Sequence, residues 1–200
     1  MLQVPRNYND SLFDLQLSEA TPQAGPVAHA PGYCRLSATQ RFGAMMERHI
    51  LDRLQAQGYH CELNNDFNAA YDIRLYNQGD ILPIEVKARR PVVQRRKAGL
   101  SRDVWPYDLN GGLGARSDHL FILVQVHRMG AIACYCVPSA YLIGAGRHSV
   151  TLTSPSERYS GFLSPFLEDW QQIAIVSAWR SKYNAIRAGQ LSLFDSEVLQ

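Results

Sequence analysis

The sequence predicts an α/β protein, and three observations support this class. Residues 37–58 have the periodicity of an amphipathic helix, strand-like segments follow them, and a second helical pattern begins at 165. With 200 residues and 46% hydrophobic composition, the chain is long enough to bury one core. We expect three parts, namely a flexible N-terminal arm, 1–36, a folded domain, 37–188, and a C-terminal tail, 189–200.

Composition and charge exclude some classes of protein. No run of about 18 apolar residues could span a bilayer, and residues 1–10 lack the pattern of a secretory signal. The four cysteines have no zinc-site spacing, so we expect reduced thiols and a cytoplasmic protein that does not enter a membrane. The net charge of +2 is only mildly basic and does not by itself indicate nucleic-acid binding.

The first helix is predicted over 37–58. Ser37 with Gln40 three residues later has the pattern of a capping box, and Gly58 stands where a helix would end. Apolar residues recur between them at three- and four-residue spacing, which predicts one buried side. Glu47 lies near the edge of that side, where it is either a solvated surface residue or part of a site.

An antiparallel hairpin is predicted over 71–88. Residues 59–63 have strand composition, residues 71–76 alternate in polarity, and turn residues lead into the next strand, 81–90. The hairpin places Asp72 on a strand next to Glu85. Whether both side chains share a face depends on the register, which the sequence pattern leaves open.

The strand 81–90 carries a Glu-x-Lys pattern. Because successive strand residues point to opposite faces, Glu85 and Lys87 project from one face and leave the other to Ile84, Val86 and Ala88. The pair suits a plain surface ion pair. It also suits a site in which the carboxylate holds a divalent cation and the ammonium contacts a phosphate oxygen.

A basic run follows this strand and consists of Arg89, Arg90, Arg95, Arg96, Lys97 and Arg102. Such a run forms a solvated face or, directly after a Glu-x-Lys strand, holds a nucleic-acid phosphate backbone. Trp105 follows closely. We expect it to pack in the core, although a tryptophan here could also stack on an exposed base.

The second half of the chain supplies the remaining core. Residues 119–126 and 131–137 are the two most apolar strands and are expected at the centre of the sheet. A short helix is predicted over 138–143, a strand over 149–153 and a long helix within 165–189. The expected packing positions of the long helix are Leu167, Trp170, Ile173, Ala174, Ala178, Trp179, Tyr183 and Ile186.

The order of these elements resembles the PD-(D/E)XK nuclease superfamily. The motif in this chain is Tyr71-Asp72, twelve intervening residues, and Glu85-Val86-Lys87, preceded by a helix that bears Glu47. The resemblance covers 37–137 and implies a restriction-endonuclease-like core with a central mixed β-sheet flanked by helices. The chain departs from the family pattern in two places, since Tyr71 stands where the family proline often lies and no strong helix follows Lys87.

The resemblance implies a Mg²⁺-dependent DNA endonuclease, with Mn²⁺ able to substitute. Asp72, Glu85 and the Val86 carbonyl would bind the metal, and Glu47 would act through a water or a second metal. Lys87 would orient or help to deprotonate the attacking water, and the basic run would hold DNA. The alternative hypothesis is a noncatalytic DNA- or clamp-binding accessory protein with a vestigial site. The DNA structure that is preferred and the oligomeric state, including a homodimer, stay open.

The C-terminal tail carries a second motif. Gln190, Leu191, Leu193 and Phe194 resemble the short motif by which bacterial replication and repair proteins bind the β sliding clamp. The resemblance implies recruitment to the clamp in DNA repair, recombination or replication. The alternative is a tail that folds back onto its own domain.

Overall fold

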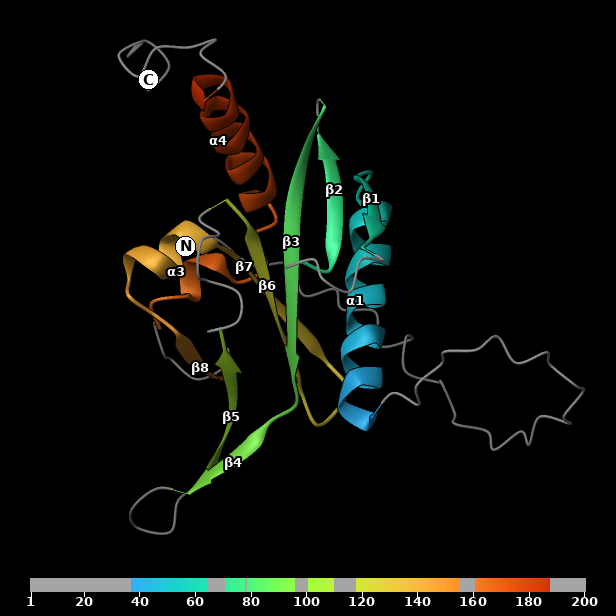
Figure 1. Ribbon diagram of the computed structural model, residues 1–200. Coiled ribbons are helices and arrows are strands. Elements are labelled where there is room, and N and C mark those ends of the chain that lie inside the picture. Colours follow the sequence, from blue (N-terminus) through green and yellow to red (C-terminus); the bar gives the residue numbers. More distant parts are fainter. Residues whose placement is uncertain are drawn as a thin grey trace, which may run out of the picture. The chain divides into compact units, whose positions relative to one another are not determined.

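The computed structural model describes residues 37–64, 71–77, 79–95, 101–109, 118–154 and 161–187 (Figure 1). The predictions for the N-terminal arm and for the C-terminal tail with its clamp-like motif lie outside the described residues, as do Arg96 and Lys97. No helix within the described ranges is long and apolar enough to cross a membrane.

The described residues form three α-helices, one 3-10 helix and eight strands. In chain order they are α1 Ala38–Ala56, β1 His60–Leu63, β2 Ile73–Asn77, β3 Asp80–Arg89, β4 Val92–Arg95, β5 Ser101–Asp108, β6 Leu120–Val126, β7 Ile132–Pro138, α3 Ser139–Gly144, β8 Ser149–Thr153, η3 Ser164–Phe166 and α4 Gln172–Arg187. The central sheet has the strand order β1-β2-β3-β6-β7, and β3 lies antiparallel to β2 but parallel to β6. The sheet is therefore mixed, as the resemblance implies.

The predicted first helix is confirmed, including both of its ends. The Ser37 hydroxyl accepts from the Gln40 backbone N–H at 3.2 Å, and the Gln40 side chain accepts from the Ser37 N–H at 2.8 Å. At the other end, Gly58 has a φ of +89°, and the Tyr59 N–H donates to the Leu54 carbonyl at 3.1 Å. These contacts are a capping box and a Schellman motif, which fix the length of α1.

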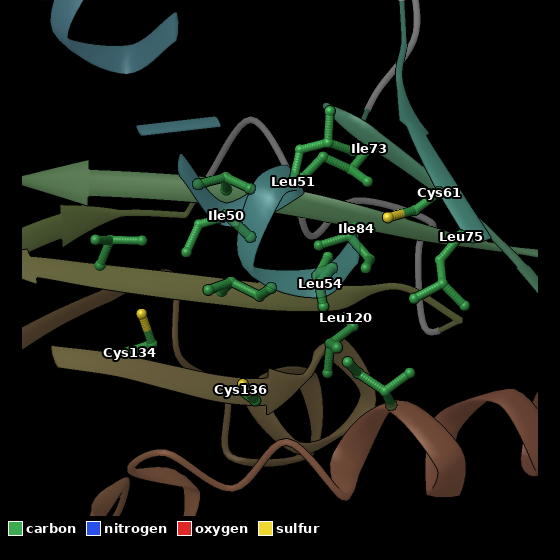
Figure 2. Close-up of a cluster of buried hydrophobic side chains, with 14 of the residues drawn as sticks. Ile50, Leu51, Leu54, Cys61, Ile73, Leu75, Ile84, Leu120, Cys134 and Cys136 are labelled. Atoms are coloured by element: carbon green, nitrogen blue, oxygen red, sulfur yellow. The ribbon is translucent and has the colours of Figure 1, made fainter. Parts of the chain in front are cut away.

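One face of the central sheet is covered by α1 and α4. Figure 2 shows Leu54 of α1 beside Ile84 and Leu120 of the sheet, and all three side chains are fully buried. Ile173 and Val176 of α4 belong to the same buried cluster. This close-packed core keeps β3 rigid, so the side chains on its opposite face have a fixed position.

The other face of the central sheet is covered by α3, η3 and a small second sheet. This sheet has the order β4-β5-β8 and takes the position after Lys87 where the superfamily usually has a helix. No strong helix is predicted after Lys87, and β4 and β5 form an antiparallel hairpin there. Trp105 and Tyr107 of β5 are 1% exposed, so the prediction that Trp105 packs in the core is confirmed.

The predicted centre of the sheet is partly wrong, because β7 lies at an edge. Its Cys134 exchanges hydrogen bonds with Glu168, whose N–H donates to the Cys134 carbonyl at 2.8 Å and whose side chain accepts from the Cys134 N–H at 2.8 Å. Arg53 of α1 donates to the same carboxylate at 2.7 Å. The edge therefore has polar partners, which explains why an apolar strand can lie there.

The long C-terminal helix lies within the predicted range of 165–189. The segment from 165 continues as η3 and turns, and α4 starts only at Gln172. Several of the expected packing positions are exposed, including Trp179 and Tyr183, each 43% exposed. Their rings stack on each other at 5.4 Å, and contact between the two rings replaces burial in the core.

Candidate metal centre

The β2–β3 hairpin brings Asp72 close to Glu85. Ile73 is the first residue of β2 and pairs with Ile84, and the Asp72 N–H, one residue earlier, donates to the Ile84 carbonyl at 2.9 Å. The negative charge of Glu85 contributes to raising the pKa of Asp72, so the two carboxylates are near enough to interact.

A second contact fixes the Asp72 side chain beside β3. Its Oδ2 accepts a hydrogen bond of 2.8 Å from the backbone N–H of Val86. The N–H and the carbonyl of a strand residue point to the same edge of the strand, so the Val86 carbonyl is directed to the edge on which Asp72 lies. The side chain of Val86 is 7% exposed and belongs to the core of the opposite face.

Glu85 and Lys87 form an ion pair on the face that they share. Glu85 is more buried than a surface pair requires, since only 7% of the residue is exposed, whereas the Lys87 side chain is 29% exposed. The sequence offered a surface ion pair and a functional site as alternatives. The structure has an ion pair, and its carboxylate is withdrawn from solvent.

The electrostatic environment shows that Glu47 belongs to the same group. Burial is the main cause that raises the pKa of Glu47, the negative charge of Glu85 adds to it, and Lys87 opposes it. Glu47 thus lies close enough to both residues to interact with them. The structure brings together all four side chains that the sequence proposed, from α1, the start of β2 and β3.

The pKa of Asp72 is raised to about 7, well above the ordinary value of 3.8. Burial is the largest cause, and the charges of Glu85 and Glu47 add to it. The hydrogen bond from Val86 and the charge of Lys87 act in the opposite direction but do not compensate. The group therefore has an excess of negative charge that a cation would neutralise.

The donor atoms of this group fit Mg²⁺. Mg²⁺ prefers hard oxygen ligands and is commonly held by only one or two carboxylates, with water completing its shell. Asp72, Glu85 and the Val86 carbonyl supply such oxygens, and Glu47 supplies a third carboxylate nearby. Within the described ranges, no three His, Cys, Asp or Glu side chains are gathered closely enough to hold a metal ion by themselves.

A pocket of about 320 Å³ adjoins the charged group. It is lined by Thr39, Phe42, Gly43, Val86, Lys87, Ala88, Arg89 and Asp108. A side chain at Gly43 would have only the Glu47 carboxylate within reach, at 3.7 Å, so the glycine leaves space between α1 and the site. The sequence pattern did not single out Thr39, Gly43 and Asp108, which line this pocket.

The basic run is divided among several positions. Arg89 donates to the Pro106 carbonyl at 3.2 Å, and the guanidinium of Arg90 lies 4.6 Å from the ring centroid of Phe42. Arg95 is exposed on β4, and Arg102 donates to the Gln94 side chain at 3.0 Å. Arg89 and Arg90 therefore lie near the pocket, whereas Arg95 and Arg102 lie on the second sheet.

Tyr71, directly before Asp72, packs its ring against that of His119. The two rings meet edge to face with centroids 5.9 Å apart. His119 is buried at the start of β6, next to Asp118, which forms an ion pair with Arg180 of α4. The residue before Asp72 is thus held by packing across the sheet.

Two solved structures resemble this chain. The bacterial homing endonuclease I-Ssp6803I matches with a TM-score of 0.51 and 16% identity, over 74% of this chain and 98% of that chain. A Holliday junction resolvase from the archaeal hyperthermophile Archaeoglobus fulgidus matches with a TM-score of 0.41 and 16% identity, over 66% and 95%. No protein-family model and no curated protein sequence matches. The chain therefore has a mixed α/β fold similar to that of the homing endonuclease, and the predicted fold class is confirmed.

Proposed function

We propose that this protein is a metal-dependent DNA endonuclease that hydrolyses phosphodiester bonds. The observation that carries the proposal is that Glu47, Asp72, Glu85 and Lys87 lie close together. Burial and the neighbouring carboxylates raise the pKa of Asp72 to about 7. Such an excess of buried negative charge is unfavourable without a cation. The similarity of the fold to a homing endonuclease agrees with this function.

Asp72, Glu85 and the Val86 carbonyl would hold Mg²⁺ or Mn²⁺, and Glu47 would act through a water or a second ion. The chemistry supplied by the bound ion is Lewis acidity, which stabilises charge on the phosphoryl oxygens and makes the attacking water more acidic. In the reaction, the water oxygen forms a bond to phosphorus and the ester P–O bond breaks. The water loses a proton, and the departing oxygen gains one.

Lys87 would orient the attacking water and stabilise the charge that develops in the transition state. Its Nζ is paired with Glu85, and its side chain also lines the pocket beside α1. Arg89 lines the same pocket, and Arg90 lies over Phe42 at its margin. The pocket would thus take the phosphate that is cleaved or its neighbour, with cations on the β3 side.

The test is incubation of the full chain with supercoiled, linear, nicked, branched and single-stranded DNA in the presence of Mg²⁺ or Mn²⁺. Cleavage that needs the metal, and that EDTA stops, is the expected result. Absence of cleavage on every substrate with both metals would sink the proposal. The substrate that is cut fastest would also decide among restriction, junction-resolving and repair activities.

A noncatalytic accessory protein is the second candidate. Two observations favour it. Lys87 is paired with Glu85, and among the described residues no three metal-binding side chains lie close enough together to hold an ion. This candidate predicts DNA binding without metal dependence. Calorimetric titration with Mn²⁺ distinguishes the endonuclease from the accessory protein. An intact site binds Mn²⁺ in the wild type and loses this binding in Asp72→Ala. A vestigial site binds Mn²⁺ in neither protein.

We also propose that the C-terminal tail, independently of the nuclease site, recruits the protein to the β sliding clamp. The supporting observation is the sequence Gln190-Leu191-Ser192-Leu193-Phe194, which offers apolar anchors and a glutamine to a pocket. Deletion of 190–200 should abolish capture by immobilised clamp and leave DNA cleavage in the absence of clamp unchanged. Capture that survives the deletion would rule out this role of the tail.

A further inference from the structure

The strand β4 has every side chain exposed to solvent. Val92 is 54% exposed, Val93 is 50% exposed, and Gln94 and Arg95 are exposed as well. Strands normally bury at least one face, so the valines here gain little from folding. An exposed strand of this kind is a candidate surface for a partner.

The outer part of the β4–β5 hairpin is a ribbon of two strands. We use "the ribbon" for residues 92–95 and 101–103. β8 pairs with β5 only from Val104 onward, so within the described part of the chain no third strand pairs with the ribbon. Figure 1 shows this hairpin extending beyond the end of β3, at the end of that strand nearer Lys87.

Three contacts hold the base of the ribbon. Asp103 accepts two hydrogen bonds of 2.8 Å from Arg128, and the Trp105 indole N–H donates to the Val126 carbonyl at 3.2 Å. Arg89 joins β3 to β5 through the Pro106 carbonyl. The ribbon therefore has a fixed direction relative to Lys87, two residues before Arg89.

The charge of the ribbon favours a polyanion. Arg95 and Arg102 are cationic, and the one acidic residue of the described ribbon, Asp103, is paired with Arg128. Pairing of the β4 edge with a second copy of the chain would bring the arginines of two ribbons together, which like-charge repulsion opposes. A nucleic acid meets the same arginines with phosphates.

We propose that the ribbon enters the major groove of duplex DNA and contacts base edges there, next to the bond that is cut. The proposal rests on the nuclease function and names its substrate class as double-stranded. The major groove, about 12 Å wide, admits a two-stranded β-ribbon and presents a distinct pattern for each base pair, whereas the minor groove is about 6 Å wide and its pattern is degenerate. Val92, on the same face of β4 as Gln94, then contacts a thymine methyl group instead of solvent.

The two faces of the ribbon have different roles. Gln94 and Arg102 are direct cross-strand neighbours on one face, joined by a hydrogen bond of 3.0 Å that holds both side chains in position. Gln is the common partner of adenine and Arg of guanine, so this face contacts the bases. Arg95 projects from the opposite face and contacts phosphate along the groove wall.

The distance from Lys87 limits where bases are contacted. Gln94 follows Lys87 by seven residues. At about 3.3 Å per extended residue this is at most about 23 Å, or about seven base pairs at 3.4 Å each. Sequence preference should therefore fall within about seven base pairs of the cleaved phosphate.

The experiment measures binding of the full chain to a pool of duplexes with random sequence, in Ca²⁺, followed by anisotropy on the selected duplex and on its single strands. Gln94→Thr and Arg102→Thr should lose roughly 5- to 100-fold preference at one or two base pairs. Arg95→Thr should weaken binding to every duplex and lower the salt slope by about 0.9. Threonine keeps the strand propensity. Arg48→Ala, which removes an exposed cation of α1 paired with Asp52, is the control and should change neither quantity.

Methylation of guanine N7, which marks the major groove, should interfere with binding of the wild type at the positions that Arg102→Thr no longer distinguishes. Equal affinity for single strands and duplex, or no N7 interference, would overturn the proposal. So would ribbon variants that change the oligomeric state in sedimentation while DNA affinity stays constant, because the ribbon would then be an interface between copies. If one of these outcomes is found and the protein still cleaves DNA, the ribbon proposal is refuted and the nuclease function is not. If the ribbon contacts bases but the protein cleaves no DNA, only the nuclease function is refuted.

Discussion

The Asp72 carboxylate accepts a 2.8 Å hydrogen bond from the backbone N–H of Val86, at the point where β2 begins and β3 continues. A side chain here takes the position that a backbone carbonyl would have in a longer hairpin. The contact holds Asp72 against the strand that bears Glu85 and Lys87. Burial and the charges of Glu85 and Glu47 raise the pKa of Asp72 to about 7 in spite of this hydrogen bond, so the place that Asp72 takes in the site is unfavourable without a cation.

Asp72→Asn should stabilise the protein in EDTA at pH 8. Because the pKa of Asp72 is about 7 in the folded chain and 3.8 ordinarily, the folded state binds the extra proton between these values. Stability of the wild type therefore falls as pH rises from about 4 to about 7 and stays lower above that. Asparagine can still accept from Val86 without carrying a charge, so the variant should gain up to a few kcal/mol at pH 8.

The measurement is urea unfolding of both proteins at pH 4 and pH 8. At pH 4 the Asp72 carboxyl is protonated in the folded wild type, and the difference between the two proteins should nearly vanish. A difference of the same size at both pH values would contradict the assignment of the raised pKa to Asp72.

Glu85→Gln should remove stabilisation by Mg²⁺. A ligand that binds only the folded state at 100 times its dissociation constant adds about 2.7 kcal/mol to stability. In thermal unfolding, Mg²⁺ or Mn²⁺ should raise the stability of the wild type by such an amount and should not raise that of Glu85→Gln. Glu62→Gln is the matched control on β1, with an exposed side chain, and should keep the full effect. A rise retained by Glu85→Gln would place the metal elsewhere.

Gly43→Ala should separate stability from DNA binding. Gly43 lies inside α1, and an added methyl would meet only the Glu47 carboxylate at an ordinary distance, so helix propensity should add up to about 1 kcal/mol. The same methyl enters the pocket beside Lys87, and DNA affinity should fall severalfold. Gly58→Ala should instead destabilise the protein, because the φ of +89° at this position strains any residue other than glycine. Unchanged DNA affinity of Gly43→Ala would remove the pocket from the binding surface.

Ile84→Ala should destabilise the protein by about 2–5 kcal/mol, because Ile84 is fully buried behind the site and its loss leaves a cavity. Ile175→Ala, at a position 56% exposed on α4, is the control and should stay within about 0.5 kcal/mol of the wild type. Chemical unfolding measures both. Equal effects of the two substitutions would contradict the packing of β3 on α1.

The proximity of Glu47, Asp72, Glu85 and Lys87 could be predicted from the sequence because these residues lie on or next to strongly patterned elements. The turn carries a signal for the register as well. The Asn77–Asp80 pair closes the hairpin with Gly79 at a φ of +89°, and four residues back along each strand lie Ile73 and Ile84. The turn therefore determines the pairing of the two residues that are adjacent in sequence to Asp72 and Glu85.

Two features could not be predicted from pattern. β4 buries no side chain, so it lacks the alternation by which a strand is recognised, and the basic composition predicted a solvated face or a phosphate-binding segment without indicating a strand. On α4, Trp179 and Tyr183 have helical spacing typical of a core stripe, yet they stack on each other in solvent. Periodicity identifies an apolar face but not whether the fold supplies something to cover it.

The central claim is that Lys87 acts beside a metal held by Asp72 and Glu85, and single-turnover cleavage tests it most directly. Wild type and Lys87→Ala are compared on the DNA that the wild type cuts fastest, with saturating Mg²⁺. Lys87→Ala should cut about 10²- to 10³-fold more slowly, as expected for loss of a preorganised charge, and should still bind Mn²⁺ in calorimetry. Control Lys182→Ala on α4 should cut at the wild-type rate. Undiminished cleavage by Lys87→Ala would contradict the account.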